Sequence, residues 1–388
     1  MIKEKYSKRS EKILSQPMFD ILKKAAEIEK NKKVIHFEIG DSSSFENTRM
    51  QTILAKYLNN PQSLGYSPSA GETCLREAFS FHYTNLTKNK IDVSSVVITP
   101  ANAAITQIFQ TILDVGDSVL LPNPGFPTYK IAANKLGLKV GFYNIKESDR
   151  FQLNVKHIIK ILQTKRIKLI VINNPSNPIG IAHNRDDIDQ IVSFCNKNNI
   201  FVLLDDTYRN LIYIDDYPRV SHQRNLIYLY SISKDTASPA LRIGCIISNP
   251  LITKKIEKDN SSFYSCLPKF IQIAVSEYLF EDHRKFRREM REELKNRIEY
   301  AHLRLKNIKS ISYVKPDAGM YFYINIKKLG MTDKEFANTL LTNHCVAVCP
   351  GSSFGTSGKY YIRLCISIKK NEFIAGIKKL AKFIISCE

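Results

Sequence analysis

Short apolar runs and longer mixed stretches alternate through the middle of the chain. The runs have the length of a strand, are rich in Val, Ile and Leu, and show little polar alternation: residues 94–99, 118–121, 139–143, 168–173, 200–204, 225–231 and 243–248. Such runs are typical of parallel strands that are buried on both faces. Between them lie stretches of helical length, such as residues 103–113 and 185–197. Strands that alternate with helices predict an α/β fold around a mostly parallel, seven-stranded sheet.

The C-terminal part of the chain has a different pattern. Residues 282–307 are highly charged and indicate a long amphipathic helix, and strand-like segments follow at residues 321–326 and 360–367. These elements predict a smaller α+β domain that packs with the N-terminal arm. We therefore expect three parts: an arm that contributes to the small domain at residues 1–40, a large domain at 41–275, and the rest of the small domain at 276–388.

The composition describes a folded protein with a strong positive charge. The 388 residues are 44% apolar, which is enough for a sizeable core and excludes a disordered chain or a mini-protein. The 57 basic and 37 acidic side chains give a formal charge of +20. Such a charge could attract nucleic acid, anionic lipid or a small phosphorylated ligand. Because the basic residues form no long basic arm, we favour a lysine-rich solvated surface and expect no nucleic-acid partner.

The cysteines and the N-terminus indicate the compartment. Eight cysteines are scattered without a Cys-x-x-Cys pair or a cluster with His, so we expect neither a disulfide framework nor a metal site. The N-terminus is charged and polar, unlike a signal peptide, and no run approaches the roughly 18 apolar residues of a membrane span. We therefore expect a cytoplasmic protein with reduced thiols and no membrane contact.

Polar residues are concentrated directly after three of the apolar runs. The segments are NNPSNPIG at residues 173–180, DDTY at 205–208 and SISK at 231–234. In open α/β sheets ligands bind beyond the carboxyl ends of the strands, so these segments are expected to meet at one site. A rigid loop, PNPGFPTY at residues 122–129, could hold the Phe126 ring against a planar ligand, although aromatic rings are more often packed in a core.

Lys234 is the residue in this set best suited to nucleophilic chemistry. A lysine at the mouth of a sheet can be partly desolvated, and Arg242 adds positive charge, so its pKa is expected to fall. Ser231 and Ser233, together with Arg242, form a reasonable phosphate cradle. Asp205 would project into a site with little water. Taken singly, a surface lysine and a surface or helix-capping aspartate are the more common explanations.

Together, these segments resemble the pyridoxal-phosphate-dependent aminotransferases of fold type I, class I/II, and the likeness runs from about Ile35 to the end of the chain. It rests most on SISK at residues 231–234, followed at the expected spacing by LRIG at 241–244. The resemblance implies a pyridoxal 5′-phosphate cofactor bound in the large domain. The likeness continues through NPSNP at 174–178, DDTY at 205–208, PGSSFG at 350–355 and YIRL at 361–364.

The resemblance also implies roles toward the cofactor. Lys234 would hold it as an internal aldimine and then act as the base, and Asp205 would pair with the pyridine nitrogen. Asn177 and Tyr208 would donate to the ring hydroxyl oxygen, and Phe126 would stack on the ring. Lys234, Asp205 and Tyr208 are thus the catalytic candidates. The phosphate would be held by Ser231, Ser233, Arg242 and a segment at an expected helix start, Ala101, Asn102 and Ala103.

On the substrate side, the resemblance implies that Arg363 clamps the α-carboxylate, with Gly40 and Asn177 contributing. Tyr66 resembles the tyrosine that reaches the phosphate from the neighbouring subunit, which implies a homodimer with shared active sites. Several positions depart from the family pattern, and we expect them to affect the substrate more than the cofactor: Ala101, Ile179, Asp206, Ala240 and the serines at residues 42–44.

The expected reaction moves an amino group between an L-amino acid and a 2-oxo acid, as in amino-acid biosynthesis. Two alternatives stay open. The fold also includes decarboxylases of phosphorylated amino acids, and the positive charge makes a phosphorylated substrate worth considering. A regulator that binds the cofactor without catalysis belongs to another class, but the short segment before the resemblance shows no convincing helix-turn-helix.

Overall fold

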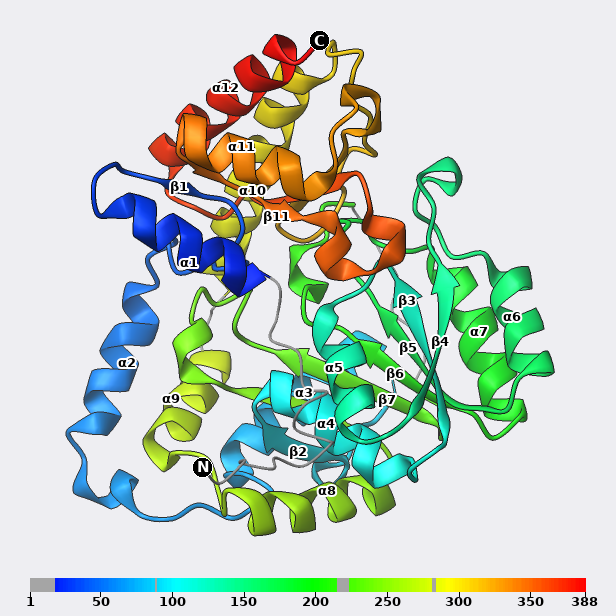
Figure 1. The fold of residues 1–388 in the computed structure, drawn as a ribbon. Coiled ribbons are helices and arrows are strands. Elements are labelled where there is room, and N and C mark those ends of the chain that lie inside the picture. The colour runs from blue at the N-terminus through cyan, green and yellow to red at the C-terminus, as the bar shows by residue number, and fades with distance from the viewer. Residues whose placement is uncertain (1–17, 88, 215–222, 281–283) are drawn as a thin grey trace, which may run out of the picture.

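The computed structural model describes residues 18–87, 89–214, 223–280 and 284–388, and Figure 1 shows their arrangement. Its centre is a seven-stranded sheet with the strand order β2-β8-β7-β6-β5-β3-β4. β8 is antiparallel to both of its neighbours, and the other pairs are parallel. The predicted α/β fold with a mostly parallel sheet is therefore confirmed. The strands are β2 (Val96–Thr99), β3 (Ser118–Asn123), β4 (Lys139–Asn144), β5 (Ile167–Asn173), β6 (Phe201–Asp205), β7 (Leu226–Ser231) and β8 (Gly244–Ile247).

Both faces of this sheet are buried except at its edge strand β4, where only Tyr143 is buried. Alternate residues of β5 point to opposite faces, so Leu169 and Val171 join one apolar cluster while Ile170 and Ile172 join another. This double burial explains why the strands show little polar alternation in the sequence. The first cluster includes residues of α4 (Ala101–Ile112), α5 (Pro127–Lys135) and α8 (Pro250–Phe263). The second includes residues of α2 (Thr48–Leu58), α3 (Thr73–Thr87), α6 (Val155–Thr164), α7 (Arg185–Lys197) and α9 (Lys269–Phe280).

A third apolar cluster is built mainly from the two ends of the described chain, which lie together at the top of Figure 1. The strand β1 (Ile35–His36) pairs in parallel with β10 (Val346–Ala347), and β11 (Cys349–Pro350), β12 (Tyr361–Cys365) and β9 (Tyr321–Asn325) form an antiparallel sheet. The helices here are α1 (Met18–Glu29), α10 (Arg284–Leu305), α11 (Asp333–His344) and α12 (Lys370–Ser386).

The C-terminal elements match the patterns in the sequence. The long helix expected at residues 282–307 is α10, although residues 282 and 283 lie outside the described residues. The strand-like segments at 321–326 and 360–367 contain β9 and β12. Short 3-10 helices connect the larger elements: η2 (Pro61–Leu64), η3 (Val93–Ser95), η4 (Glu147–Asp149), η5 (Arg209–Leu211), η6 (Pro239–Leu241), η7 (Lys327–Leu329), η8 (Gly351–Phe354) and η9 (Thr356–Gly358).

Three further observations concern membranes, metals and thiols. Among the described helices, none is long and apolar enough to cross a bilayer. Within the same residues, no group of three or more His, Cys, Asp or Glu side chains is arranged to hold a metal ion. All eight cysteines lie in the described part of the chain, and each is a free thiol.

Candidate active site

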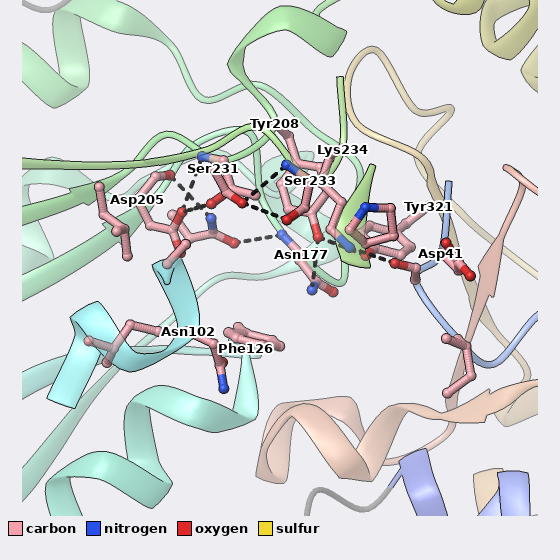
Figure 2. A pocket seen from close by; sticks show the side chains of 18 of the residues that line it. Asp41, Asn102, Phe126, Asn177, Asp205, Tyr208, Ser231, Ser233, Lys234 and Tyr321 are labelled. Carbon is pink, nitrogen blue, oxygen red and sulfur yellow. Dashed lines mark hydrogen bonds between the residues drawn. The ribbon is translucent and has the colours of Figure 1, made fainter. Parts of the chain in front are cut away.

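A cavity of about 420 Å³ opens beyond the carboxyl ends of the central strands. β5, β6 and β7 end at Asn173, Asp205 and Ser231, and all three residues line it. The three polar segments that follow apolar runs in the sequence therefore meet at one site, as a parallel sheet requires. Figure 2 shows the labelled side chains converging on this cavity. The segment before the central sheet contributes Met18, Phe19, Ile39, Gly40 and Asp41 to its wall, and the segment after it contributes Tyr321 and Arg363.

Lys234 projects its amine into the cavity, where the Nζ atom donates to the backbone oxygen of Gly40 at 2.6 Å (Figure 2). Burial lowers the pKa of Lys234, because a charged ammonium is poorly solvated there. The positive charges of Arg363 and Arg242 lower this pKa further, whereas Cys365 and Asp41 oppose the shift. A larger fraction of the amine is thus unprotonated at neutral pH than in an exposed lysine, which suits a nucleophile or a base.

Asp205 lies at the end of β6 and is only 5% exposed. Its carboxylate accepts hydrogen bonds from Tyr129 Oη at 2.5 Å, Thr207 Oγ1 at 2.6 Å and Thr207 N at 3.1 Å. Burial raises the pKa of Asp205, although these hydrogen bonds oppose the shift. Among the ion pairs of the described residues, none involves this carboxylate. Asp205 is therefore a buried acid whose hydrogen bonds fix its direction but leave its charge without a cation.

Arg363 lies in β12 and is 1% exposed. Its Nη1 donates to Asn177 Oδ1 at 3.0 Å, and its Nη2 donates to the backbone oxygen of Glu38 at 2.5 Å. The guanidinium carbon lies 4.5 Å from the ring centre of Tyr321 and 4.7 Å from that of Phe354. The Nε atom is buried without a hydrogen-bond partner, and no described carboxylate pairs with this side chain. A buried guanidinium in this state is suited to an incoming carboxylate.

Tyr208 connects the two sides of the cavity. Its hydroxyl lies 2.7 Å from the Tyr321 hydroxyl and accepts a long hydrogen bond of 3.5 Å from Asn177 Nδ2. Gly40 passes so close to this pair that a Cβ atom there would lie 2.2 Å from Tyr321 Oη. Burial raises the pKa of Tyr208, so its hydroxyl keeps its proton and remains a hydrogen-bond donor at neutral pH.

The opposite end of the cavity carries hydroxyls, a guanidinium and a helix N-terminus. Ser231 Oγ donates to Ser233 Oγ at 2.9 Å. Arg242 is exposed, has a left-handed backbone with φ of 57° and donates to the backbone oxygen of Pro239 at 2.8 Å. Ala101 and Asn102 begin α4 and also line the cavity. The unbonded N–H groups and the positive end of the dipole at a helix start favour a bound anion.

The structure brings together most of the residues expected from the sequence. Phe126 lines the cavity with its ring 5.7 Å from that of Tyr129 in an edge-to-face contact. Two expected residues lie outside this lining. Ala103 faces a neighbouring groove between α4, α5 and α8, and Tyr66 is 90% exposed on the surface. The expected residues in the lining are Gly40, Ala101, Asn102, Phe126, Asn177, Asp205, Tyr208, Ser231, Ser233, Lys234, Arg242 and Arg363.

Sequence reasoning missed several residues of this site. Thr207 follows Asp205 by two positions and Tyr129 ends the loop that carries Phe126, so both lay within the segments already quoted. Asp41 directly follows Gly40, which was itself a candidate residue. No local signal identified Tyr321, Met18 or Phe19, because they reach the cavity from distant parts of the chain.

Of the positions that depart from the family pattern, only Ala101 lines the cavity. Ile179 is 1% exposed in the apolar cluster that contains α3 and α7. Asp206 turns away from the site and pairs with Arg209, and Tyr83 Oη donates to it at 3.2 Å. Its influence on a substrate can therefore only be indirect.

Comparison with known proteins agrees with this geometry. The family described as "Aminotransferase class I and II" matches residues 32–380. A protein of Bacillus subtilis (strain 168), "Probable N-acetyl-LL-diaminopimelate aminotransferase", is 30% identical over 367 residues, which cover 92% of this chain and 91% of that protein. The aspartate aminotransferase of Pyrococcus horikoshii is 30% identical over 322 residues, 82% of each chain. The solved structure of an alanine aminotransferase from Pyrococcus furiosus has a TM-score of 0.90 and 26% identity, with 98% of this chain and 100% of that chain covered.

The fold and the lysine-centred cavity define a fold type I enzyme, and the chain belongs to the class I and II aminotransferases. It is an enzyme that transfers amino groups, and its cofactor is pyridoxal 5′-phosphate, as the resemblance implied. The predicted family, reaction class and cofactor are therefore confirmed. None of the relatives named here is described as a decarboxylase.

Proposed function

We propose that the transfer takes place at the cavity around Lys234, with an L-amino acid as donor and a 2-oxo acid as acceptor. The observation that carries this proposal is a set of three ionisable side chains that line one cavity. Lys234, Asp205 and Arg363 are buried or half-buried, and within the described residues none forms an ion pair. Burying a charge without a partner is costly, so such groups suit ligands that bring the opposite charge.

The residues of the cavity fit pyridoxal 5′-phosphate. When bound, this cofactor accepts the electron pair that is released when a bond at the substrate Cα breaks. Asp205 supplies the buried carboxylate that would keep a pyridine nitrogen protonated, and Tyr129 and Thr207 hold it in position. Phe126 supplies a ring face, and Asn177 and Tyr208 supply donors for the ring oxygen. The phosphate would lie among Ser231, Ser233, Arg242 and the first turn of α4, which contains Ala101, Asn102 and Ala103.

Lys234 is the only lysine among the described residues of the lining, so we assign the proton transfer at the substrate Cα to its Nζ atom. The lowered pKa supports this role, because the amine must be unprotonated to accept that proton. Arg363 would bind the α-carboxylate through its guanidinium, beside Asn177 and the backbone of Gly40. The α-carboxylate would thus be held while Cα faces the amine.

We further propose a homodimer in which Tyr66 of one subunit reaches the phosphate end of the other site. In support of this, Tyr66 is 90% exposed and lies next to Leu64, which is 64% exposed. Exposed large apolar side chains in one segment are typical of a contact surface. We also propose that the enzyme serves amino-acid biosynthesis and that it is located in the cytoplasm. Its cofactor would be bound by a large domain at residues 41–275. The free state of all eight cysteines suits a reducing compartment.

The test follows the visible absorption of the purified holoenzyme while L-amino acids are added one at a time and carbon dioxide is monitored. We expect the absorption to change with a suitable amino acid and to return when a 2-oxo acid is added, without release of gas. The panel should include aspartate and N-acetyl-LL-diaminopimelate, which relatives act on according to their names. Release of carbon dioxide without any need for an oxo acid would contradict transamination and favour the decarboxylase alternative.

A further inference from the structure

The segment that carries Tyr66 connects α2 to α3 and runs past α8 at the lower edge of Figure 1. Tyr66 is 90% exposed, so packing of its own side chain does not fix its position within the subunit. Gly65 before it is also open, since a Cβ atom there would meet no other described residue within 4 Å apart from its chain neighbours. The position of the tyrosine is therefore set by contacts of the backbone on either side of it.

The side chain of Asn260 in α8 holds the backbone that follows Tyr66. Its Nδ2 atom donates to the backbone oxygen of Ser69 at 3.0 Å and to that of Ile98 in β2 at 3.2 Å. The Ile98 backbone N donates in turn to the oxygen of Ala70 at 2.9 Å. Asn260 is fully buried and both hydrogens of its amide are used, so it joins the loop to the edge of the central sheet in one geometry.

The oxygen of the same amide connects the loop to α4. Asn260 Oδ1 accepts from Gln107 Nε2 of α4 and from Tyr264 Oη, both at 2.6 Å. Gln107 Oε1 accepts in turn from Thr99 Oγ1 at 2.6 Å, at the end of β2 and just before α4 begins. Gln107 and Thr99 are buried as well. The loop of Tyr66 and the helix whose first turn lies at the phosphate end of the cavity thus share one buried hydrogen-bond network.

We propose that Asn260 is a positioning residue that acts on the active site of the neighbouring subunit by holding the segment of Tyr66. This inference rests on the proposed function, in which Tyr66 reaches the phosphate end of the other site. A hydrogen bond from its hydroxyl to a phosphate requires a distance of about 2.5–3.0 Å and good alignment, so a small shift of the backbone would break it. The nearer contact, from Ser67 N to Cys266 Sγ at 3.3 Å, ends on sulfur, which is a weak acceptor, so we assign the hold to Asn260.

The experiment uses hybrid dimers that contain two different chains. The donor subunit carries Lys234→Ala and supplies Tyr66 to its neighbour, and the reporting subunit keeps Lys234. Only the reporting subunit binds the cofactor covalently, so its visible absorption describes a single site. Asn260→Ala is introduced into the donor subunit alone. The dissociation constant of pyridoxal 5′-phosphate at the reporting site, its kcat/KM and the thermal unfolding of the hybrid are measured.

Asn260→Ala in the donor subunit should raise the dissociation constant at the reporting site by about tenfold, as for the loss of one hydrogen bond to a charged group. Tyr66→Phe in the donor should have a similar effect, and the two changes together no more than either alone, because both act through one hydroxyl. Asn260→Ala in the reporting subunit should have the smaller effect. There Tyr66 comes from an intact chain, and Ala104, Ile105 and Ile108 keep α4 in its apolar cluster.

Asn225→Ala is the matched control. Asn225 is also a buried amide, 8% exposed, but it lies directly before β7, at the end of the strand away from the cavity. It should lower the temperature of unfolding without changing the dissociation constant, whichever subunit carries it. Asn260→Ser keeps one donor in the buried position, and it replaces Asn260→Ala if that variant does not assemble. Its effect should have the same direction.

Three results would overturn the inference. The first is an Asn260→Ala donor that leaves the reporting site unchanged, and the second is an effect that adds to that of Tyr66→Phe. The third is a larger effect in the reporting subunit than in the donor, which would show that Asn260 acts within its own chain. An unaffected site in the Tyr66→Phe hybrid, or a monomeric protein, would contradict the proposed dimer contact itself, and so is distinguishable from failure of the role of Asn260 alone.

Discussion

Asp205 and Asp206 are neighbours at the end of β6, and each is 5% exposed, but their surroundings differ. Asp206 pairs with Arg209, which also lies 5.2 Å from the ring centre of Tyr83. Asp205 points to the other side, toward Tyr129, and has hydroxyl donors in place of a cation. The two carboxylates have the same chemistry, so the difference lies in what the tertiary structure places next to each.

The same contrast separates two groups of buried charges. On the Asp206 side, Arg287 Nη2 lies 2.7 Å from Asp235 Oδ2, and the Tyr230 hydroxyl donates to the same oxygen at 2.7 Å. Two buried ion pairs are thus matched within the chain: Asp206 with Arg209, and Asp235 with Arg287. In the cavity wall, Lys234, Asp205 and Arg363 have no such partners among the described residues. Buried charges that are matched within the chain become costly when one partner is removed, whereas unmatched ones are available to ligands.

The largest effect is expected for Lys234→Ala, which removes the only lysine of the described lining. Turnover should fall by about 10⁴-fold or more, because both the covalent hold on the cofactor and the base are lost. Borohydride reduction followed by mass spectrometry should find no covalently held cofactor, while circular dichroism remains that of the wild type. Covalent cofactor retained in this variant would show that another lysine performs the role.

The next largest effect is expected for Arg363→Ala. Under the proposed function, the variant would lose two charge-assisted hydrogen bonds to the substrate carboxylate, worth about 1.5–3 kcal/mol each, so kcat/KM should fall by about 10³-fold. Arg363→Lys is the matched variant, since it keeps the charge but not the planar fork. Cofactor content should stay unchanged in both. Loss of cofactor with undiminished affinity for amino acids would mean that the division between substrate and cofactor residues is wrong.

Asp205→Asn and Asp206→Asn test the comparison directly. Asp206→Asn leaves Arg209 buried without its partner, so the free energy of unfolding should fall by about 3 kcal/mol. Asp205→Asn should instead lower kcat by about 10²-fold without any loss of stability in the cofactor-free protein. Urea unfolding of the cofactor-free proteins and steady-state kinetics separate the two effects. Equal losses of stability in the two variants would contradict the distinction.

The pH dependence of the free energy of unfolding gives a further test of Asp205. Its pKa is raised in the folded protein, so the folded state holds the proton more tightly than the unfolded state. The free energy of unfolding of the cofactor-free protein should therefore decrease as pH rises above the ordinary carboxyl pKa of 3.8, and Asp205→Asn should remove that decrease. An unchanged pH profile in the variant would mean that the carboxylate is better solvated than the structure indicates.

The smallest effect concerns a paired charge close to Arg363. His36 Nδ1 lies 2.7 Å from Glu38 Oε1, and the hydrogen bond to Glu38 raises the pKa of His36 to about 9. A raised histidine pKa stabilises the fold fully below the ordinary value of 6.5, and this stabilisation is lost as pH rises through 9. Because His36 is partly exposed, we expect only about 1 kcal/mol.

Urea unfolding at pH 6 and pH 9.5 measures this contribution. His36→Gln should remove about 1 kcal/mol of pH-dependent stability. His157→Gln, at an exposed position in α6, is the matched control and should behave as the wild type. A His36→Gln variant with the full pH dependence would assign that dependence to other groups.

The sequence predicted the central sheet well for a physical reason. Strands buried on both faces must be apolar at nearly every position, so β5 and β6 can be recognised without knowledge of their neighbours. The topology of parallel strands then requires their carboxyl ends to meet, which brings Asp205 and Ser231 together before any distance is known. Tyr321 could not be found in this way, because nothing within its own segment distinguishes it from the other aromatic residues of β9.

By itself, the sequence determined the α/β fold, the family and the segments that form the site, because strand burial and the SISK, DDTY and YIRL segments are local properties of the chain. Only the tertiary structure decided which buried charges are paired. Arg363 meets Asn177 across 186 positions, and the backbone oxygen of Asp41 accepts from Ser367 Oγ across 326 positions. Arg209 lies only three positions from Asp206, but Asp235 is paired by the distant Arg287, so that pair follows from the packed fold and not from a motif.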